Sequence, residues 1–119
     1  MDVVEASFPD REFKIWDYLV SHRQMVIRSL GPKEGSANLD LHFHGVEFVR
    51  APTIFNGLAV VTATDGEIAE AQTLVAHCDE SMVWVLESER QRFLVVAASL
   101  DIAETDFPMM STALIHPSI

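Results

Sequence analysis

The segment 38–50, NLDLHFHGVEFVR, constrains the fold more than any other part of the chain. Before Gly45 two sets of residues alternate: Leu39, Leu41 and Phe43 are apolar, and Asp40, His42 and His44 are polar. This period of two is typical of a strand with one apolar and one polar face. After Gly45 the phase changes, because Val46 and Phe48 become the apolar residues. A glycine at such a change indicates a β-bulge or a sharp bend.

Other segments have the β-branched and aromatic content of strands. They are 12–20, 24–29, 57–64, 82–87 and 92–103. The links between them are short and rich in turn residues, which favours hairpins and antiparallel pairing. We therefore expect a mainly β (α+β) domain, with six to seven strands in a strongly curved antiparallel sheet or small barrel.

The segment that begins at Thr64 has two interpretations. Its Asp65-Gly66 pair suits a hairpin turn, whereas Thr64 and Glu67 have the spacing of a capping box at the start of a helix. The alanine and glutamate content favours a helix over residues 66–77. One face of that helix would then be apolar, formed by Ile68, Ala71, Leu74, Val75 and Cys78.

A chain of 119 residues suits a single domain spanning 1–119. Residues 1–10 end in a Pro-Asp pair and are expected to form a loosely held arm. The mean hydropathy of +0.18 is high for a small domain. This value indicates a large core or an apolar sheet face that packs on a second copy, so we expect a homodimer.

The charge is strongly acidic, with 18 acidic and 8 basic residues and a net charge of −10. Residues 61–119 hold ten acidic and two basic residues, a net of −8, whereas residues 1–60 hold eight and six, a net of −2. Nucleic acid and anionic membranes would be repelled, so neither is expected as a partner. Such a surface would speed encounter with a basic protein partner, and the alternative is that the net charge only keeps the domain soluble.

The single cysteine, Cys78, excludes an internal disulfide and suits a reducing compartment. We expect a cytoplasmic protein, because the chain lacks a signal-peptide pattern and an apolar stretch of about 20 residues. No glycine-rich phosphate loop is present, so no cofactor is expected. Cys78 itself is expected to be a buried, unreactive thiol.

The polar face of 38–50 is the first candidate site. Alternate strand positions lie about 6–7 Å apart, so His42 and His44 could converge on one metal ion. Metal-binding cupins also use an HxH pair, but Glu47 follows His44 too closely for their pattern. A third ligand would come from His77 or His116. The alternative is a polar face exposed to solvent.

Further candidates line the first hairpin. Trp16 and Tyr18 share one face of the first strand, which makes them a binding surface or a second buried layer. Arg28 either pairs with Asp17 or Glu12 across the hairpin or binds an anion. The predicted ligand or partner surface comprises Trp16, Tyr18, His22, Arg28, Asp40 and Arg50.

Several short motifs along the chain form a recognisable set: Trp16-Asp17-Tyr18, Ser21-His22, Ile27-Arg28-Ser29, Asp40, Phe43, Gly45-Val46-Glu47, Pro52-Thr53, Leu86-Glu87-Ser88 and Val95-Val96-Ala97. Together they resemble a group of small uncharacterised bacterial proteins. The resemblance covers most of the chain and implies a bacterial, single-domain protein. It implies no activity, cofactor or catalytic residue.

Together these features favour a small, acidic, cytoplasmic protein that binds or interacts rather than catalyses, with an inhibitor or immunity protein as one version. The alternative is a barrel with a small-molecule or metal site. That site would use the face of Asp40, His42 and His44, together with Arg28 or Arg50.

Overall fold

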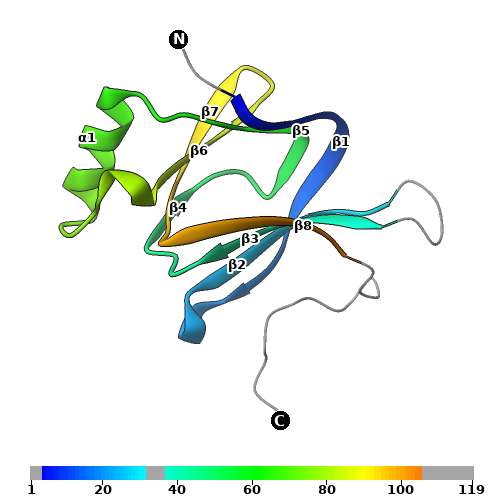
Figure 1. Ribbon diagram of the computed structural model, residues 1–119, viewed down its shortest axis with the longest axis horizontal. Coiled ribbons are helices and arrows are strands. Elements are labelled where there is room, and N and C mark those ends of the chain that lie inside the picture. The colour runs from blue at the N-terminus through cyan, green and yellow to red at the C-terminus, as the bar shows by residue number, and fades with distance from the viewer. Residues whose placement is uncertain (1–3, 32–36, 106–119) are drawn as a thin grey trace.

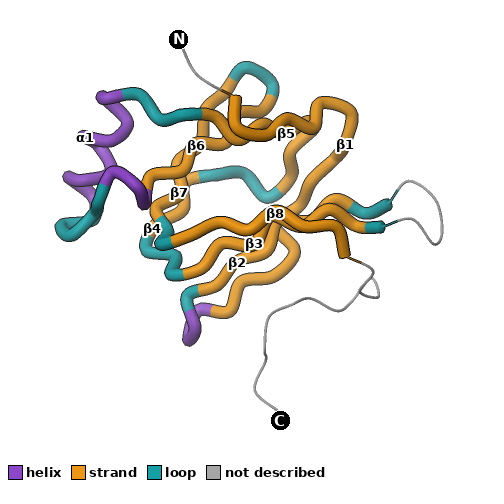
Figure 2. Tube along the Cα trace, viewed as in Figure 1, coloured by secondary structure: helices purple, strands orange, loops and turns teal. Residues whose placement is uncertain are grey.

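The computed structural model describes residues 4–31 and 37–105, and strands dominate this part of the chain (Figures 1 and 2). The strands are β1 (Val4–Leu19), β2 (Gln24–Ser29), β3 (Asn38–His44), β4 (Phe48–Arg50), β5 (Ile54–Val61), β6 (Val83–Ser88), β7 (Gln91–Val96) and β8 (Ser99–Thr105). The helices are α1 (Asp65–Leu74) and the short 3₁₀ helices η1 (Val20–His22) and η2 (Glu80–Met82). Over these residues the mainly antiparallel β fold with one α-helix is confirmed.

The eight strands of the described residues form one sheet in the order β4-β7-β6-β5-β1-β2-β3-β8. All the pairs are antiparallel. The sheet is not closed, so the small barrel is not confirmed. The strand count exceeds the expected six to seven because two of the predicted strands, 38–50 and 92–103, are each divided in two.

Both divisions occur at one place. Gly45 follows the last residue of β3 and has a φ of +64°, a backbone conformation that favours glycine. A Cβ atom on Gly45 would lie 2.8 Å from the Cβ of Ala98, which separates β7 from β8. The Ala98 N–H donates to the carbonyl of His44 at 2.8 Å. The bend predicted at Gly45 is therefore present, and it is matched by a second bend in the strand beside it.

Strand β1 is longer than the sequence indicates, because residues 4–10 belong to it rather than to a loose arm. Ala6, Ser7 and Phe8 lie opposite residues of β5. The second half of β1 pairs with β2 across the η1 turn. One long strand thus changes partner along its length, and the sheet bends with it.

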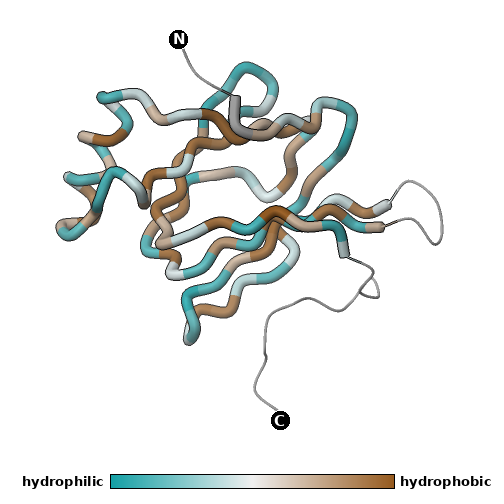
Figure 3. The backbone as a smooth tube through the Cα atoms, in the orientation of Figure 1, coloured by the Kyte–Doolittle hydropathy of each residue, from teal (hydrophilic) through white to brown (hydrophobic). Residues whose placement is uncertain are grey.

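The main core lies on the inner side of the curved sheet, where side chains from β1, β2, β3, β5, β6 and β7 meet. Figure 3 shows apolar stretches along these strands and hydrophilic residues at the hairpin turns. A second cluster lies on the outer side, where α1 contacts β6 and β7. In this cluster Ala71 and Val75 are buried and Ile68 is partly buried, but Leu74 is 48% exposed. The helix ends at Leu74 rather than at 77, and Leu74 does not belong to the buried face on which it was expected.

The capping box predicted at Thr64 is present. The Thr64 hydroxyl accepts from the Glu67 N–H, and the Glu67 carboxylate accepts from the Thr64 N–H. Within the described ranges, no helix is long and apolar enough to span a membrane.

Candidate functional site

A cleft of about 520 Å³ lies where the middle of β1 meets the end of β2. Its lining includes the cations Arg11, Lys14 and Arg28, the carboxylates Asp10 and Glu12, and the indole of Trp16. Three of the eight Lys and Arg residues of this acidic chain therefore line one cleft. Its volume falls within the roughly 300–1,000 Å³ of small-molecule sites.

Two irregularities in β1 shape this cleft. Between Phe8 and Glu12, residues 9–11 of β1 lie opposite the single residue Gly57 of β5. Gly57 has a φ of +76°, and a Cβ atom there would lie 2.8 Å from the carbonyl oxygen of Pro9. The bulge at residues 9–11 therefore requires glycine at position 57. It carries Asp10 and Arg11 to the cleft instead of leaving them in a regular ladder.

The second irregularity lies between Ile15 and Asp17. Before it Lys14 lies opposite Arg28, and after it Tyr18 lies opposite the core residue Met25. Trp16 packs against Leu19 and Val26, and the Arg28 guanidinium carbon lies 5.6 Å from the Trp16 ring centroid. The bulge thus leaves Trp16 on the outer face with Lys14 and turns Tyr18 to the other face. The expectation that Trp16 and Tyr18 share a face is wrong, because period-two reasoning assumes a regular strand.

Arg28 and Asp40 form a buried, bidentate ion pair. Arg28 Nε donates to Asp40 Oδ1 at 2.7 Å, and Nη2 donates to Oδ2 at 2.9 Å. The Arg28 and Asp40 side chains are 0% and 4% exposed. The hydroxyl of Thr105 on β8 donates to Asp40 Oδ2 at 3.0 Å. The carboxylate of this bidentate pair thus comes from β3, whereas the sequence predicts a partner within the first hairpin.

Arg11 has a different environment. Its Nε donates to the hydroxyl of Ser29 at 2.9 Å, and its Nη2 donates to the carbonyls of Ser29 and Leu30 at 3.2 and 3.3 Å. All of these acceptors are neutral. Within the part of the chain that the structure describes, Arg11 has no carboxylate within ion-pair distance, and its Nη1 has no hydrogen bond. Among the described residues, the guanidinium is therefore held in place by neutral groups and takes part in no ion pair.

Lys14 lies beside Arg11 and Arg28 in the cleft lining. Its ammonium is 3.6 Å from the Glu12 carboxylate, and the two side chains are 49% and 56% exposed. An exposed pair of this kind contributes little and exchanges easily for another partner. Lys14 can therefore turn toward an anion in the cleft.

His42 and His44 lie farther along the polar face of β3, with their rings stacked at a centroid distance of 4.0 Å. His42 Nε2 bonds the Gln24 side chain at 2.9 Å, and His44 Nε2 bonds the Asp101 carboxylate at 2.9 Å. Burial lowers the pKa of His42, and the neighbouring His44 lowers it further, while Asp101 and Asp40 oppose this. Burial and His44 together therefore favour the neutral form of His42.

A metal site at His42 and His44 would need a third ligand. Within the described ranges, no group of three or more His, Cys, Asp or Glu residues is placed to hold a metal ion. Both Nε2 atoms of the predicted pair are already hydrogen-bonded. The Nε2 atom of His77, one of the two expected third ligands, lies 3.5 Å from the Glu47 Oε1 atom instead. His116 lies outside the described residues.

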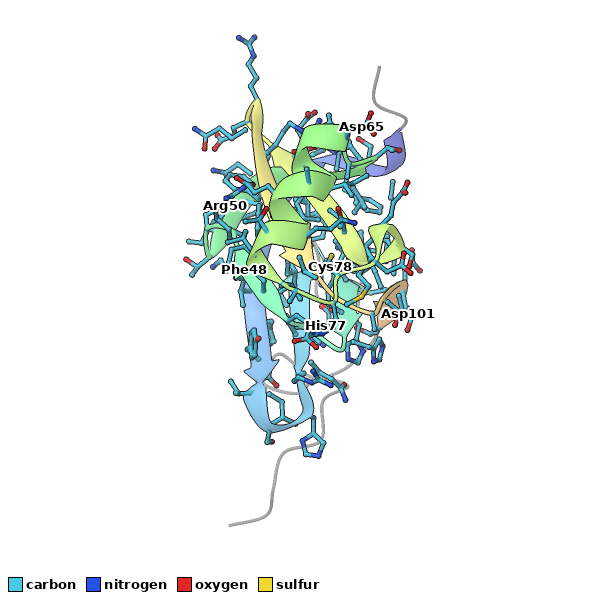
Figure 4. The ribbon with its side chains drawn as sticks, turned by 90° about the vertical axis from the view of Figure 1, so that its left-hand side faces the viewer. Phe48, Arg50, Asp65, His77, Cys78 and Asp101 are labelled. Atoms are coloured by element: carbon cyan, nitrogen blue, oxygen red, sulfur yellow. The ribbon has the colours of Figure 1, made fainter. Side chains whose placement is uncertain are left out.

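The remaining predicted residues lie elsewhere. Arg50 on β4 donates to Glu70 of α1 at 2.6 Å, and Figure 4 shows it beside the helix, on the opposite side of the view from Asp101. His22 is exposed at the η1 turn, where its Nδ1 lies 3.0 Å from the Ser21 hydroxyl. Cys78 is buried, and burial raises the pKa of its thiol.

The structure thus brings together Trp16, Arg28 and Asp40 but not His22 or Arg50. It adds Arg11 and Lys14, which sequence reasoning did not select. A bulge in a strand whose apolar and polar residues alternate is hard to recognise from a single sequence. The available signal is the Pro9-Asp10 pair, which the sequence pattern places at the end of a loose arm.

Comparisons of the chain with protein-family models, with curated proteins and with solved structures find no match. The resemblance to small bacterial proteins therefore stays an expectation. The function must be argued from the cleft itself.

Proposed function

We propose that this chain is a binding protein that holds a small organic anion in the cleft between β1 and β2. The observation that carries the proposal is the state of Arg11. Its guanidinium is fixed by three neutral oxygen acceptors and has no ion-pair partner among the described residues. A positioned guanidinium is well suited to a carboxylate, because its planar N–H groups match the two oxygens.

The surroundings support this assignment. In a chain of net charge −10, three other arginines are paired with acids: Arg23 with Glu47, Arg50 with Glu70 and Arg92 with Glu67. Arg28 is neutralised by Asp40, so within the cleft it supports Trp16 rather than binding the anion. Arg11 and Lys14 are left as the groups that would contact the ligand.

The test is a titration of the full chain with benzoate, followed by ¹H–¹⁵N NMR. We expect saturable shifts confined to residues 10–16 and 28–30. In Arg11→Gln the loss of one charge-assisted hydrogen bond, about 1.5–3 kcal/mol, should weaken binding by roughly 10–100-fold.

Arg50→Gln is the matched control, because it removes the same charge beside α1. It should leave benzoate binding unchanged. Equal loss of binding in both variants would reduce the effect to net charge and contradict the proposal. Absence of saturable binding in the wild-type protein would contradict it as well.

A basic protein partner and a homodimer stay predictions from the sequence. In the acidic half Glu67, Glu70 and Glu87 are already paired with arginines of the same chain. These pairs reduce the charge that this half can offer to a cationic surface. For this reason the cleft, rather than the acidic half, is the better-supported binding site.

A further inference from the structure

We infer that the ligand of the cleft is a flat-ringed monocarboxylate whose ring lies on Trp16. This inference rests on the proposed function, since it assumes that Arg11 receives the anionic group. It adds the class of the ligand, which follows from the other walls of the cleft.

The first argument is size. An inorganic anion or acetate would occupy a small part of a cleft of about 520 Å³ and would leave its apolar wall in water. That wall contains Trp16 and Leu30, the latter 39% exposed. A ligand with a ring would cover both residues, and the area removed from water would add to the binding free energy.

The second argument is the fixed position of Trp16. The Arg28 guanidinium lies against the indole ring, and Leu19 and Val26 pack beside it. Arg28 is in turn locked by its bidentate bonds to Asp40. An aromatic wall that is held in this way offers a ring an offset or edge-on contact without a large ordering cost.

The third argument is the charge balance. Asp10 and Glu12 line the same cleft as Arg11 and Lys14. Two carboxylates would repel a phosphate dianion, whereas a single carboxylate directed at Arg11 meets less opposition. The same carboxylates can accept hydrogen bonds from donor groups on the ring. A monoanion with a flat ring is therefore favoured over phosphate.

The experiment compares four probes on the full chain: 2-naphthoate, cyclohexanecarboxylate, acetate and inorganic phosphate. The background variant is Trp84→Phe, which leaves Trp16 as the only one of the two tryptophans. Its indole N–H signal and fluorescence then report on the cleft alone. We expect naphthoate to bind about tenfold or more tightly than acetate and to shift the Trp16 signal. Cyclohexanecarboxylate should fall between them, and phosphate should bind most weakly.

Two further variants test the ring contact. Trp16→Phe keeps a smaller ring, and Leu30→Ser changes an exposed wall residue without touching the core. Both should reduce the preference for naphthoate while leaving acetate binding nearly unchanged. Equal affinity of naphthoate and acetate would overturn the ring assignment and leave the anion site standing. Tighter binding of phosphate would overturn the monocarboxylate class. Failure of every anion to bind would remove the site itself.

Discussion

The outer side of the curved sheet has two halves, and they differ in the side chains that face outward and in what covers them. Over β5, β6 and β7 the helix α1 covers an apolar cluster that includes Val85, Leu94 and Val96. Over β1, β2 and β3 the residues facing outward include the ion pair of Arg28 and Asp40 and the two stacked histidines. We refer to these as the helix-covered half and the polar half.

This difference indicates that the helix-covered half contributes mainly to stability, whereas the polar half fixes the side chains of the cleft. The helix-covered half gains free energy from apolar burial, at about 25 cal/mol per Å². The polar half buries a charge pair, for which the desolvation penalty can exceed the attraction between the partners. Such a pair adds little net stability, but it fixes Arg28 and hence Trp16 in one position. The cleft thus lies in the half of the sheet that buries the charged pair of Arg28 and Asp40.

The largest expected effect comes from breaking the buried pair. Asp40→Ala leaves the Arg28 guanidinium without its bidentate carboxylate in a site where it is 0% exposed. We expect a loss of about 3–5 kcal/mol in the free energy of unfolding, measured by urea denaturation.

The double variant Arg28→Met/Asp40→Leu is the control for this prediction. Replacing both charges by apolar groups should recover most of the lost stability, because no orphaned charge remains. Ligand binding should not recover, since Trp16 loses its support. A double variant as unstable as Asp40→Ala would show that packing rather than charge dominates the polar half.

The next effect concerns the bulge that shapes the cleft. Gly57→Ala forces a side chain into a residue with a φ of +76° and places its Cβ 2.8 Å from the Pro9 carbonyl oxygen. We expect a loss of about 2–3 kcal/mol in urea unfolding and NMR shift changes at Asp10 and Arg11.

Gly66→Ala is the matched control in the helix-covered half. Gly66 lies in α1, and its nearest neighbour would be 3.9 Å away from an added Cβ. The substitution should stabilise the protein by about 0.4–1 kcal/mol. Equal tolerance at both glycines would show that the bulge is not a constraint and that the cleft is more plastic than its geometry indicates.

The structure of the helix-covered half is easier to predict from the sequence than that of the polar half. A capping box and an apolar face are local patterns, so α1 could be placed near its true bounds. In the polar half a local pattern also placed one strand, 24–29, at the residues of β2. The split at Gly45 was also visible as a change of phase. The polar half depends on what one strand places beside another. The pairing of Arg28 with Asp40 depends on the register between β2 and β3, and the position of Trp16 depends on a bulge. Neither has a local pattern.

A smaller effect tests the link between α1 and the sheet. Glu67 accepts from the Thr64 N–H and pairs with Arg92 at 2.8 Å. Glu67→Ala removes both contacts and should cost about 1–2 kcal/mol, whereas Glu67→Gln keeps the capping bond and should cost less than half of that. Arg92 lowers the pKa of Glu67, so this contribution is present above the ordinary carboxyl pKa of 4.5 and is lost as the pH falls below it. Urea midpoints measured between pH 7 and pH 3 check both statements.

The smallest effect concerns pH and belongs to the polar half. Burial and the neighbouring His44 lower the pKa of His42 below 6.5, whereas Asp101 and Asp40 oppose this, and Gln24 is its neutral hydrogen-bond partner. The unfolded chain therefore takes up a proton at His42 at a higher pH than the folded chain does. The stability that neutral His42 contributes is complete above pH 6.5 and decreases as the pH falls toward the folded pKa.

His42→Gln cannot titrate, so its urea midpoint should fall less than that of the wild type between pH 7.5 and pH 5.5. Parallel midpoints would show that His42 is solvated like a free histidine, and an NMR titration of its ring protons would then give a pKa near 6.5. A difference confined to this range would separate the two halves by pH alone, because the Glu67 contribution is lost only in more acidic solution.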